Sequence, residues 1–149
     1  MSDVRAAIVK AAEWGIAHAG AIHYTETVER SEWLHAKPYH LPISTDCSGF
    51  ATMCYWLAGA PDPNGLHYAE VGYTGTMLEH GLEVSLPLPG DLIVYGLYPG
   101  HHVVIFLDVW HGAWRVASHG NEAGPSLELQ HREQLVQPAP VSIRSYLPR

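Results

Sequence analysis

Cys47 is the residue whose type and surroundings best suit nucleophilic chemistry. It lies in the run TDCSGF at residues 45–50, where a helical apolar pattern begins. The first turn of a helix offers unpaired backbone N–H groups and the positive end of the helix dipole, and both favour thiolate over thiol. Because thiolate is the nucleophilic form of cysteine, the sequence predicts a reactive Cys47 at a helix start.

Two histidines further along the chain suit the other roles of thiol-based acyl transfer. His102 opens the apolar run 103–107, and His119 follows a second apolar run at 116–118. A nucleophilic cysteine needs a base within hydrogen-bonding reach and a group that orients the base. An antiparallel hairpin that turns near Gly112 brings His102 and His119 together. We therefore expect His102 as the base and His119 as the orienting residue.

His101 makes the choice of base ambiguous by one residue. It directly precedes His102, and successive side chains of a strand point to opposite faces. Only one of these two imidazoles can therefore face the nucleophile, and the spacing alone leaves both open.

The elements that must position these residues follow from apolar periodicity and from turn residues. Ser2 or Asp3 can cap a first helix, and Thr45 or Asp46 can cap the helix that carries Cys47. Helices followed by antiparallel strands predict an α+β fold. The expected helices cover 3–19, 47–58 and about 76–80. The expected strands cover 92–95, 102–109, 114–118, 127–129 and 141–143. Residues 20–44 are expected to be irregular.

Composition limits the classes of function. With 149 residues and 47% hydrophobic residues, the chain is expected to form one domain over residues 1–149, as a monomer. A net charge of −7 argues against nucleic-acid binding, which needs clustered Lys and Arg. The longest apolar run, 103–107, is too short for membrane insertion. No basic stretch followed by an apolar run marks a secretory signal.

The second cysteine, Cys54, reads as a core residue. It lies in the middle of the apolar stripe of the helix that begins at Cys47, seven residues further on. That spacing separates the two by about 10 Å along a helix, which is too far for a disulfide. Neither cysteine has metal-type spacing, and the histidines lack metal-like pairing, so we expect no metal and no cofactor.

Four blocks together resemble the NlpC-type cell-wall cysteine peptidases, a papain-like family. They are DCSGF at 46–50, PGDLI at 89–93, GHHVVI at 100–105 and His119. The resemblance implies N-terminal helices, with the nucleophile at a helix N-terminus, packed on an antiparallel sheet of about five or six strands. It makes Cys47 the nucleophile, His102 the base and His119 the third polar residue. The stretches 54–65 and 73–76 look like the peptidase domains of phage endolysins.

The resemblance also implies substrate contacts. Asp46 and Ser48 would help to hold the amino group of a substrate peptide, and Tyr24 would line the cleft. Each has a plainer interpretation: Asp46 as an N-cap, Ser48 as a residue of the helix start and Tyr24 as packing. Asp91 is expected to shape a turn, and the backbone N–H of Cys47 is expected to stabilise an oxyanion.

The function that these observations favour is hydrolysis of a stem-peptide or amide bond in bacterial peptidoglycan by a cysteine peptidase. The expected setting is a phage lysin or virion-associated peptidase that a holin, virion or secretion machine delivers to the wall, and a bacterial wall-remodelling or toxin-type hydrolase stays open. Two alternatives stay open. One is a thiol-dependent acyltransferase or amidase that uses the same site. The other is a non-catalytic, His-rich binding module, because the chain has 11 histidines.

Overall fold

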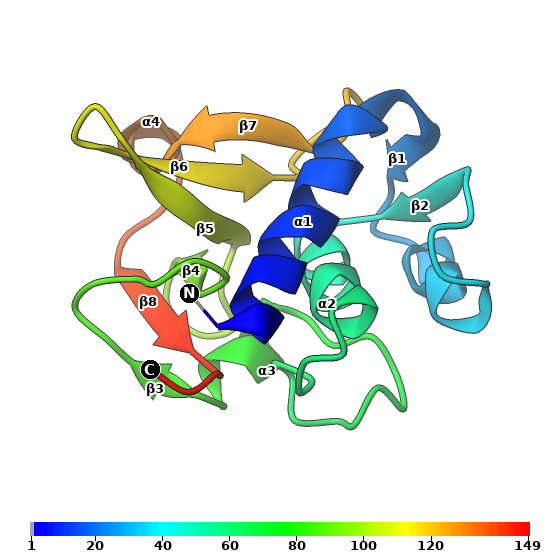
Figure 1. Cartoon of the computed structure of the whole chain (residues 1–149), viewed down its shortest axis with the longest axis horizontal. Coiled ribbons are helices and arrows are strands. Elements are labelled where there is room, and N and C mark those ends of the chain that lie inside the picture. The colour runs from blue at the N-terminus through cyan, green and yellow to red at the C-terminus, as the bar shows by residue number, and fades with distance from the viewer. Residues whose placement is uncertain (1) are drawn as a thin grey trace.

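The structure is a computed structural model that describes residues 2–149, and Figure 1 shows its arrangement. Helix α1 spans Asp3–Ala17 and begins where the Ser2 hydroxyl accepts a hydrogen bond from the Arg5 N–H. Helix α2 spans Cys47–Leu57 and is capped by Asp46, whose carboxylate accepts from the Gly49 N–H. Both helices follow the expected ranges, and Cys47 is the first residue of α2.

A six-stranded sheet forms the second layer, and all its neighbouring pairs are antiparallel. The N-terminal helices and this sheet confirm the predicted α+β class. In spatial order the strands are β3 (Leu82–Glu83), β8 (Val141–Ser145), β4 (Leu92–Tyr95), β5 (His102–Trp110), β6 (Ala113–Ser118) and β7 (Ser126–Leu129).

The sheet has a different core on each face. One face packs beneath α1 and α2 and includes Val103 and Ile105 of β5. The other face carries a smaller cluster that includes Tyr95, Val104 and Phe106. Because successive residues of a strand alternate between faces, this division assigns a face to residues 102–107 of β5, before the register shift near Asp108.

Two short helices complete the second half of the chain. Helix α3 spans Thr74–Leu78, close to the expected short helix, and α4 spans Gln130–Val136. The sequence analysis did not predict α4, nor the two-residue strand β3. Helix α4 contacts β6 and β7 and brings Glu133 close to His102 at the start of β5.

The segment 20–44 is more ordered than its sequence indicates. It contains two 3-10 helices, η1 (Ala19–Ala21) and η2 (Val28–His35). Strands β1 (Ile22–Tyr24) and β2 (Ile43–Thr45) pair in parallel as a separate two-stranded sheet. Their register sets Tyr24 opposite Thr45, two residues before Cys47. The segment therefore brings Tyr24 to the start of α2.

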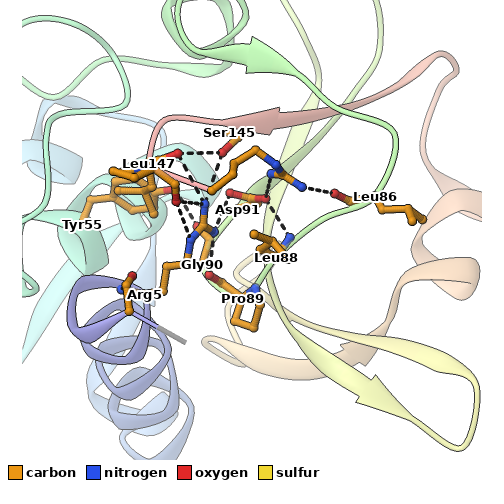
Figure 2. A network of polar contacts seen from close by, with 12 residues as sticks. Arg5, Tyr55, Leu86, Leu88, Pro89, Gly90, Asp91, Ser145 and Leu147 are labelled. Atoms are coloured by element: carbon orange, nitrogen blue, oxygen red, sulfur yellow. Dashed lines mark hydrogen bonds and ion pairs between the residues drawn. The ribbon is translucent and has the colours of Figure 1, made fainter.

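A buried ion pair ties α1 to the turn before β4 (Figure 2). The Arg5 guanidinium donates to the Asp91 carboxylate at 2.9 Å, and neither side chain is appreciably exposed. Arg149 donates to the other oxygen of the same carboxylate, also at 2.9 Å. The Leu88 N–H also donates to Asp91, which confirms that Asp91 shapes the turn. The carboxylate thus joins the two ends of the chain to the sheet.

None of the helices formed by residues 2–149 has the length and apolar character needed to cross a membrane.

Candidate active site

The sulfur of Cys47 lies against the first residues of β5. Backbone N–H groups of Val103 and Ser48 point toward it and favour its thiolate form. The Val103 N–H belongs to the peptide that links His102 to Val103. The fold therefore brings the predicted nucleophile to the backbone next to His102, but not to the His102 imidazole. No hydrogen bond joins the sulfur to an imidazole among residues 2–149.

The imidazole of His102 lies on the sheet face that is turned away from α2. His102 is the strand partner of Tyr95, and the two rings stack with centroids 6.1 Å apart. Its Nε2 atom lies 3.0 Å from the Ser118 hydroxyl oxygen and 3.8 Å from a carboxylate oxygen of Glu133. The ring is 5% exposed, so these contacts fix it within the protein.

His119 does not make the contact that the sequence predicted for it. Its ring packs edge-on against Tyr24 and Phe50, at centroid distances of 5.4 and 5.8 Å. Neither of its nitrogens makes a hydrogen bond of good geometry among residues 2–149, but the backbone and the carboxylate of Asp46 lie close enough to raise the pKa of the ring against the effect of burial. Ser118, and not His119, contacts the His102 ring. Ser118 and His119 are neighbours at the end of β6, so their side chains point to opposite faces of the sheet.

His101 lies just outside the strand, with an exposed side chain. Its backbone N–H donates to the Tyr95 carbonyl at 2.8 Å, which closes the turn into β5. His102, in contrast, is buried at the first position of the strand. The two histidines that the sequence left as alternatives thus differ in burial as well as in direction.

The resting site is electrically neutral. Burial raises the pKa of the Cys47 thiol to about 12, and the Asp46 carboxylate adds to the rise. Burial lowers the pKa of His102 to about 4, helped by repulsion from His101 and His119. Burial also lowers the pKa of His119 to about 4. The Ser48 N–H at the helix start favours the thiolate as expected, but desolvation is the larger effect, so the net pKa of the thiol is raised.

Arg30 holds the residues on both sides of Cys47. Its Nε donates to the Asp46 carboxylate at 2.7 Å, and its Nη2 donates to the Ser48 hydroxyl at 3.0 Å. The same Nη2 donates to the Gly72 carbonyl at 2.6 Å. Sequence reasoning missed Arg30, because no local motif marks a residue whose partners lie 16 to 42 positions away.

Asp46 and Ser48 therefore have structural partners already. Asp46 caps α2 through the Gly49 N–H at 2.8 Å and forms an ion pair with Arg30. Ser48 is 2% exposed and donates to Asp46 at 3.3 Å. Both plainer interpretations, an N-cap and a residue of the helix start, describe contacts that are present. Their predicted substrate contacts stay predictions.

Tyr24 lies near Cys47, and its predicted role in lining a cleft stays a prediction. Its hydroxyl donates to Glu26 at 2.8 Å, and its ring meets that of His119. Burial raises the pKa of Tyr24, with further contributions from Glu26 and from the nearby Cys47. The side chain is thus positioned to border whatever binds at the sulfur.

Gly49 is required by the close approach of β2 to α2. A Cβ atom at this position would overlap the Thr45 hydroxyl and press on the Asp46 cap. The glycine of the DCSG run therefore lets the capping carboxylate fold back over the start of the helix.

No group of three or more metal-binding side chains occurs within residues 2–149.

Comparisons with known proteins place the fold. No protein-family model matches the chain, and no curated protein matches it. A solved structure of a variant of the resuscitation-promoting-factor-interacting protein RipA is similar, with a TM-score of 0.54 and 16% identity over 98% of this chain. The hypothetical invasion protein Rv1477 of Mycobacterium tuberculosis is similar at a TM-score of 0.53 and 18% identity over 94% of this chain.

The chain spans 63% and 64% of those two proteins. At such low identity the likeness establishes the architecture, which is the papain-like α+β fold that the sequence predicts.

Proposed function

We propose that this protein is a cysteine hydrolase that cleaves a stem-peptide or amide bond in bacterial peptidoglycan. The observation that carries the proposal is the position of the Cys47 sulfur, at the start of α2 and against the peptide between His102 and Val103. The papain-like fold and the resemblance of the four sequence blocks support a peptidoglycan substrate.

In the proposed reaction, the Cys47 sulfur attacks the carbonyl carbon of the scissile bond. The His102 ring contacts Ser118 and Tyr95 on the far face of the sheet in the resting structure, so proton transfer requires the ring to turn toward the sulfur. The turned imidazole takes the thiol proton and later passes it to the leaving amine. The first N–H groups of α2 have no partner within the helix, and that of Cys47 stabilises the oxyanion. Water then hydrolyses the thioester and frees the enzyme.

The substrate peptide is proposed to bind between Tyr24 and the start of α2. Tyr24 borders the sulfur, and His119 lies behind it with two unpartnered nitrogens. A bound peptide offers polar groups to these side chains. Asp46 and Ser48 contribute by exchanging part of their bonding with Arg30 for the amino group of the substrate.

The setting proposed is that of a phage lysin, which a holin, virion or secretion machine delivers to the wall. The endolysin-like stretches at 54–65 and 73–76 support it. The need for delivery is tested by adding purified protein to intact cells and to isolated cell walls and by measuring the wall fragments released from each. We expect release of wall fragments from isolated walls only, and equal lysis of untreated intact cells would contradict the delivery requirement.

Digestion of defined muropeptides, followed by mass assignment of the fragments, tests the function directly. The wild-type protein is expected to release fragments that differ from the substrate by one water. Cys47→Ala is expected to lose this activity by several orders of magnitude while it keeps its fold. The matched control is Cys54→Ala, because Cys54 is fully buried in the core. Undiminished cleavage by folded Cys47→Ala would refute the assignment, and a product carrying a transferred acyl group would show a transferase.

A further inference from the structure

An open groove lies beside the hairpin of β5 and β6, on the sheet face that α1 covers. Its volume is about 330 Å³, at the small end of the range for sites that bind small molecules. The C-terminal half of α1 forms one wall, and β5, β6 and β7 form the other. Apart from Ala17, the lining of this hairpin groove consists of three apolar and three charged side chains: Ile16, Leu107, Leu127, Glu13, Asp108 and Arg115.

A register shift in β5 turns two side chains toward this groove. The pairing of β5 with β6 shifts between Phe106 and Asp108. Phe106 belongs to the cluster on the far face of the sheet, whereas Asp108 pairs with Arg115, which shares a face with Ala117 of the core beneath the helices. Asp108 and, two residues further on, Trp110 therefore lie on the α1 face. Such bulges re-aim side chains and are frequent next to functional sites.

The charged side chains leave hydrogen-bonding groups free in the groove. Arg115 donates to both oxygens of Asp108, from Nε and Nη2, at 2.7 Å each. Asp108 raises the pKa of Arg115, and the nearby Glu13 carboxylate adds to the rise. Among residues 2–149, neither the Glu13 carboxylate nor Arg115 Nη1 takes part in a hydrogen bond. The groove thus offers one free acceptor group and one free donor.

Trp110 presents an aromatic face next to these groups. The Arg115 guanidinium carbon lies 5.9 Å from the centroid of the indole, which holds the ring by a cation–π contact. The ring nevertheless stays 51% exposed. A large, rigid aromatic surface in this position suits a flat ligand that has one apolar face and a polar edge.

We propose that the hairpin groove binds an N-acetylated amino sugar of the glycan strand to which the stem peptide is attached. The identity of the sugar rests on the proposed function. A sugar ring has a C–H face that packs on the Trp110 indole, and its hydroxyl and amide groups accept from Arg115 and donate to Glu13. The acetyl methyl group packs against the apolar lining, which includes Leu127.

The charges of the hairpin groove favour a neutral ligand. Glu13 and Asp108 outnumber the single guanidinium of Arg115, so the groove repels phosphates and acidic sugars. Both oxygens of Asp108 are already bound to Arg115, which weakens the attraction of the groove for a cationic peptide. A neutral amino sugar meets neither obstacle.

The groove is separate from the candidate active site. The Cys47 sulfur lies against Val103, and Asp108 follows Val103 by five residues along β5. Five residues of an extended strand measure about 17 Å. Binding of sugar in the groove can therefore be measured without involving the Cys47 thiol.

Titration of the full chain with the N-acetylglucosamine tetramer, followed by NMR of the tryptophan indole N–H groups and by calorimetry, tests the inference. The tetramer carries no peptide, so a peptidase does not cleave it. We expect the Trp110 signal to shift, and Trp110→Ala and Glu13→Ala each to weaken binding by about three- to tenfold. The controls are Tyr98→Ala, which removes an exposed ring outside the groove, and Glu122→Ala, which removes an exposed carboxylate. Both should bind like wild type.

Several results would overturn the inference. One is a Trp110 signal that the tetramer does not move, and another is tetramer binding that Trp110→Ala and Glu13→Ala leave unchanged. Tighter binding of a trilysine peptide or of a galacturonate trimer would assign the groove to a charged ligand instead. A dimer in sedimentation that Trp110→Ala dissociates would make the groove an interface between two copies. If Trp110→Ala does not fold, Glu13→Ala decides. Activity retained by Cys47→Ala would refute the proposed function, whereas the binding result stands independently of it.

Discussion

Arg30 and Asp46 form an ion pair at the residue that precedes Cys47, with Arg30 Nε donating to the Asp46 carboxylate at 2.7 Å. The pair joins η2, at the surface of the N-terminal segment, to the cap of α2. Because Asp46 raises the pKa of the Cys47 thiol and Arg30 lowers it, the pair also sets the charge next to the sulfur.

Asp46→Asn is therefore predicted to make Cys47 more reactive. Asparagine caps a helix about as well as aspartate, so the start of α2 should persist, whereas the negative charge beside the thiol is lost. The alkylation rate with iodoacetamide is expected to rise at a given pH, with its midpoint shifted down from the strongly alkaline range. Asp46→Ala separates the effects, since it also removes the cap and should cost about 1 kcal/mol of unfolding free energy. Slower alkylation of Asp46→Asn than of wild type would contradict this electrostatic account.

Asp91→Asn is predicted to destabilise the fold by about 3–5 kcal/mol, because it leaves the buried Arg5 guanidinium without its counter-ion. Urea unfolding followed by circular dichroism measures the change. Arg149→Ala is the matched control, since the Arg149 side chain is 35% exposed and its loss should cost about 1 kcal/mol or less. Equal effects of the two substitutions would show that the Arg5 pair is not the main stabilising contact of this carboxylate.

Unfolding free energy is predicted to fall as the pH drops from about 6.5 to about 4. His102 and His119 have pKa values of about 4 in the folded protein, below the ordinary histidine value of about 6.5. The unfolded chain binds more protons in this window, so their contribution is complete above pH 6.5 and is lost on acidification. Each ring adds at most about 1.4 kcal/mol per pH unit.

Urea unfolding at several pH values checks this prediction. His119→Asn should flatten the slope, whereas His111→Asn should not. His111 is exposed in the turn between β5 and β6, where its positive φ of 50° suits asparagine. A slope that is the same in wild type and in His119→Asn would mean that this ring is not the group that titrates.

Gly49→Ala is predicted to disturb the start of α2, because the added methyl group overlaps the Thr45 hydroxyl. We expect a loss of about 1–3 kcal/mol of stability, as for other overpacked sites, and a fall in hydrolytic rate. Gly20→Ala is the control, since no atom lies within 4 Å of its Cβ position. Normal stability and rate in Gly49→Ala would show that β2 can move away from the helix at no cost.

Much of the scaffold could be read from local patterns. Helices α1 and α2, strand β4 and the hairpin of β5 and β6 follow apolar periodicity and turn residues, and the observed pairing of Val104 with Ser118 agrees with the predicted hairpin to within a residue or two. The parallel pairing of β1 with β2 and the helix α4 were missed. Their sequences lack a clear period, and these elements form because of the surfaces on which they pack.

The sequence by itself determined the position of Cys47 at the start of a helix and the order of the main helices and strands, because capping, periodicity and turn chemistry act between residues close in the chain. Only the tertiary structure decided the partners of each group. The fold places Ser118 and Glu133 against the His102 ring, and it places Arg30 against the Asp46 carboxylate. Strand alternation and packing fix such contacts between residues that are far apart in the chain. Burial also raised the pKa of the Cys47 thiol, and burial is a property of the whole fold.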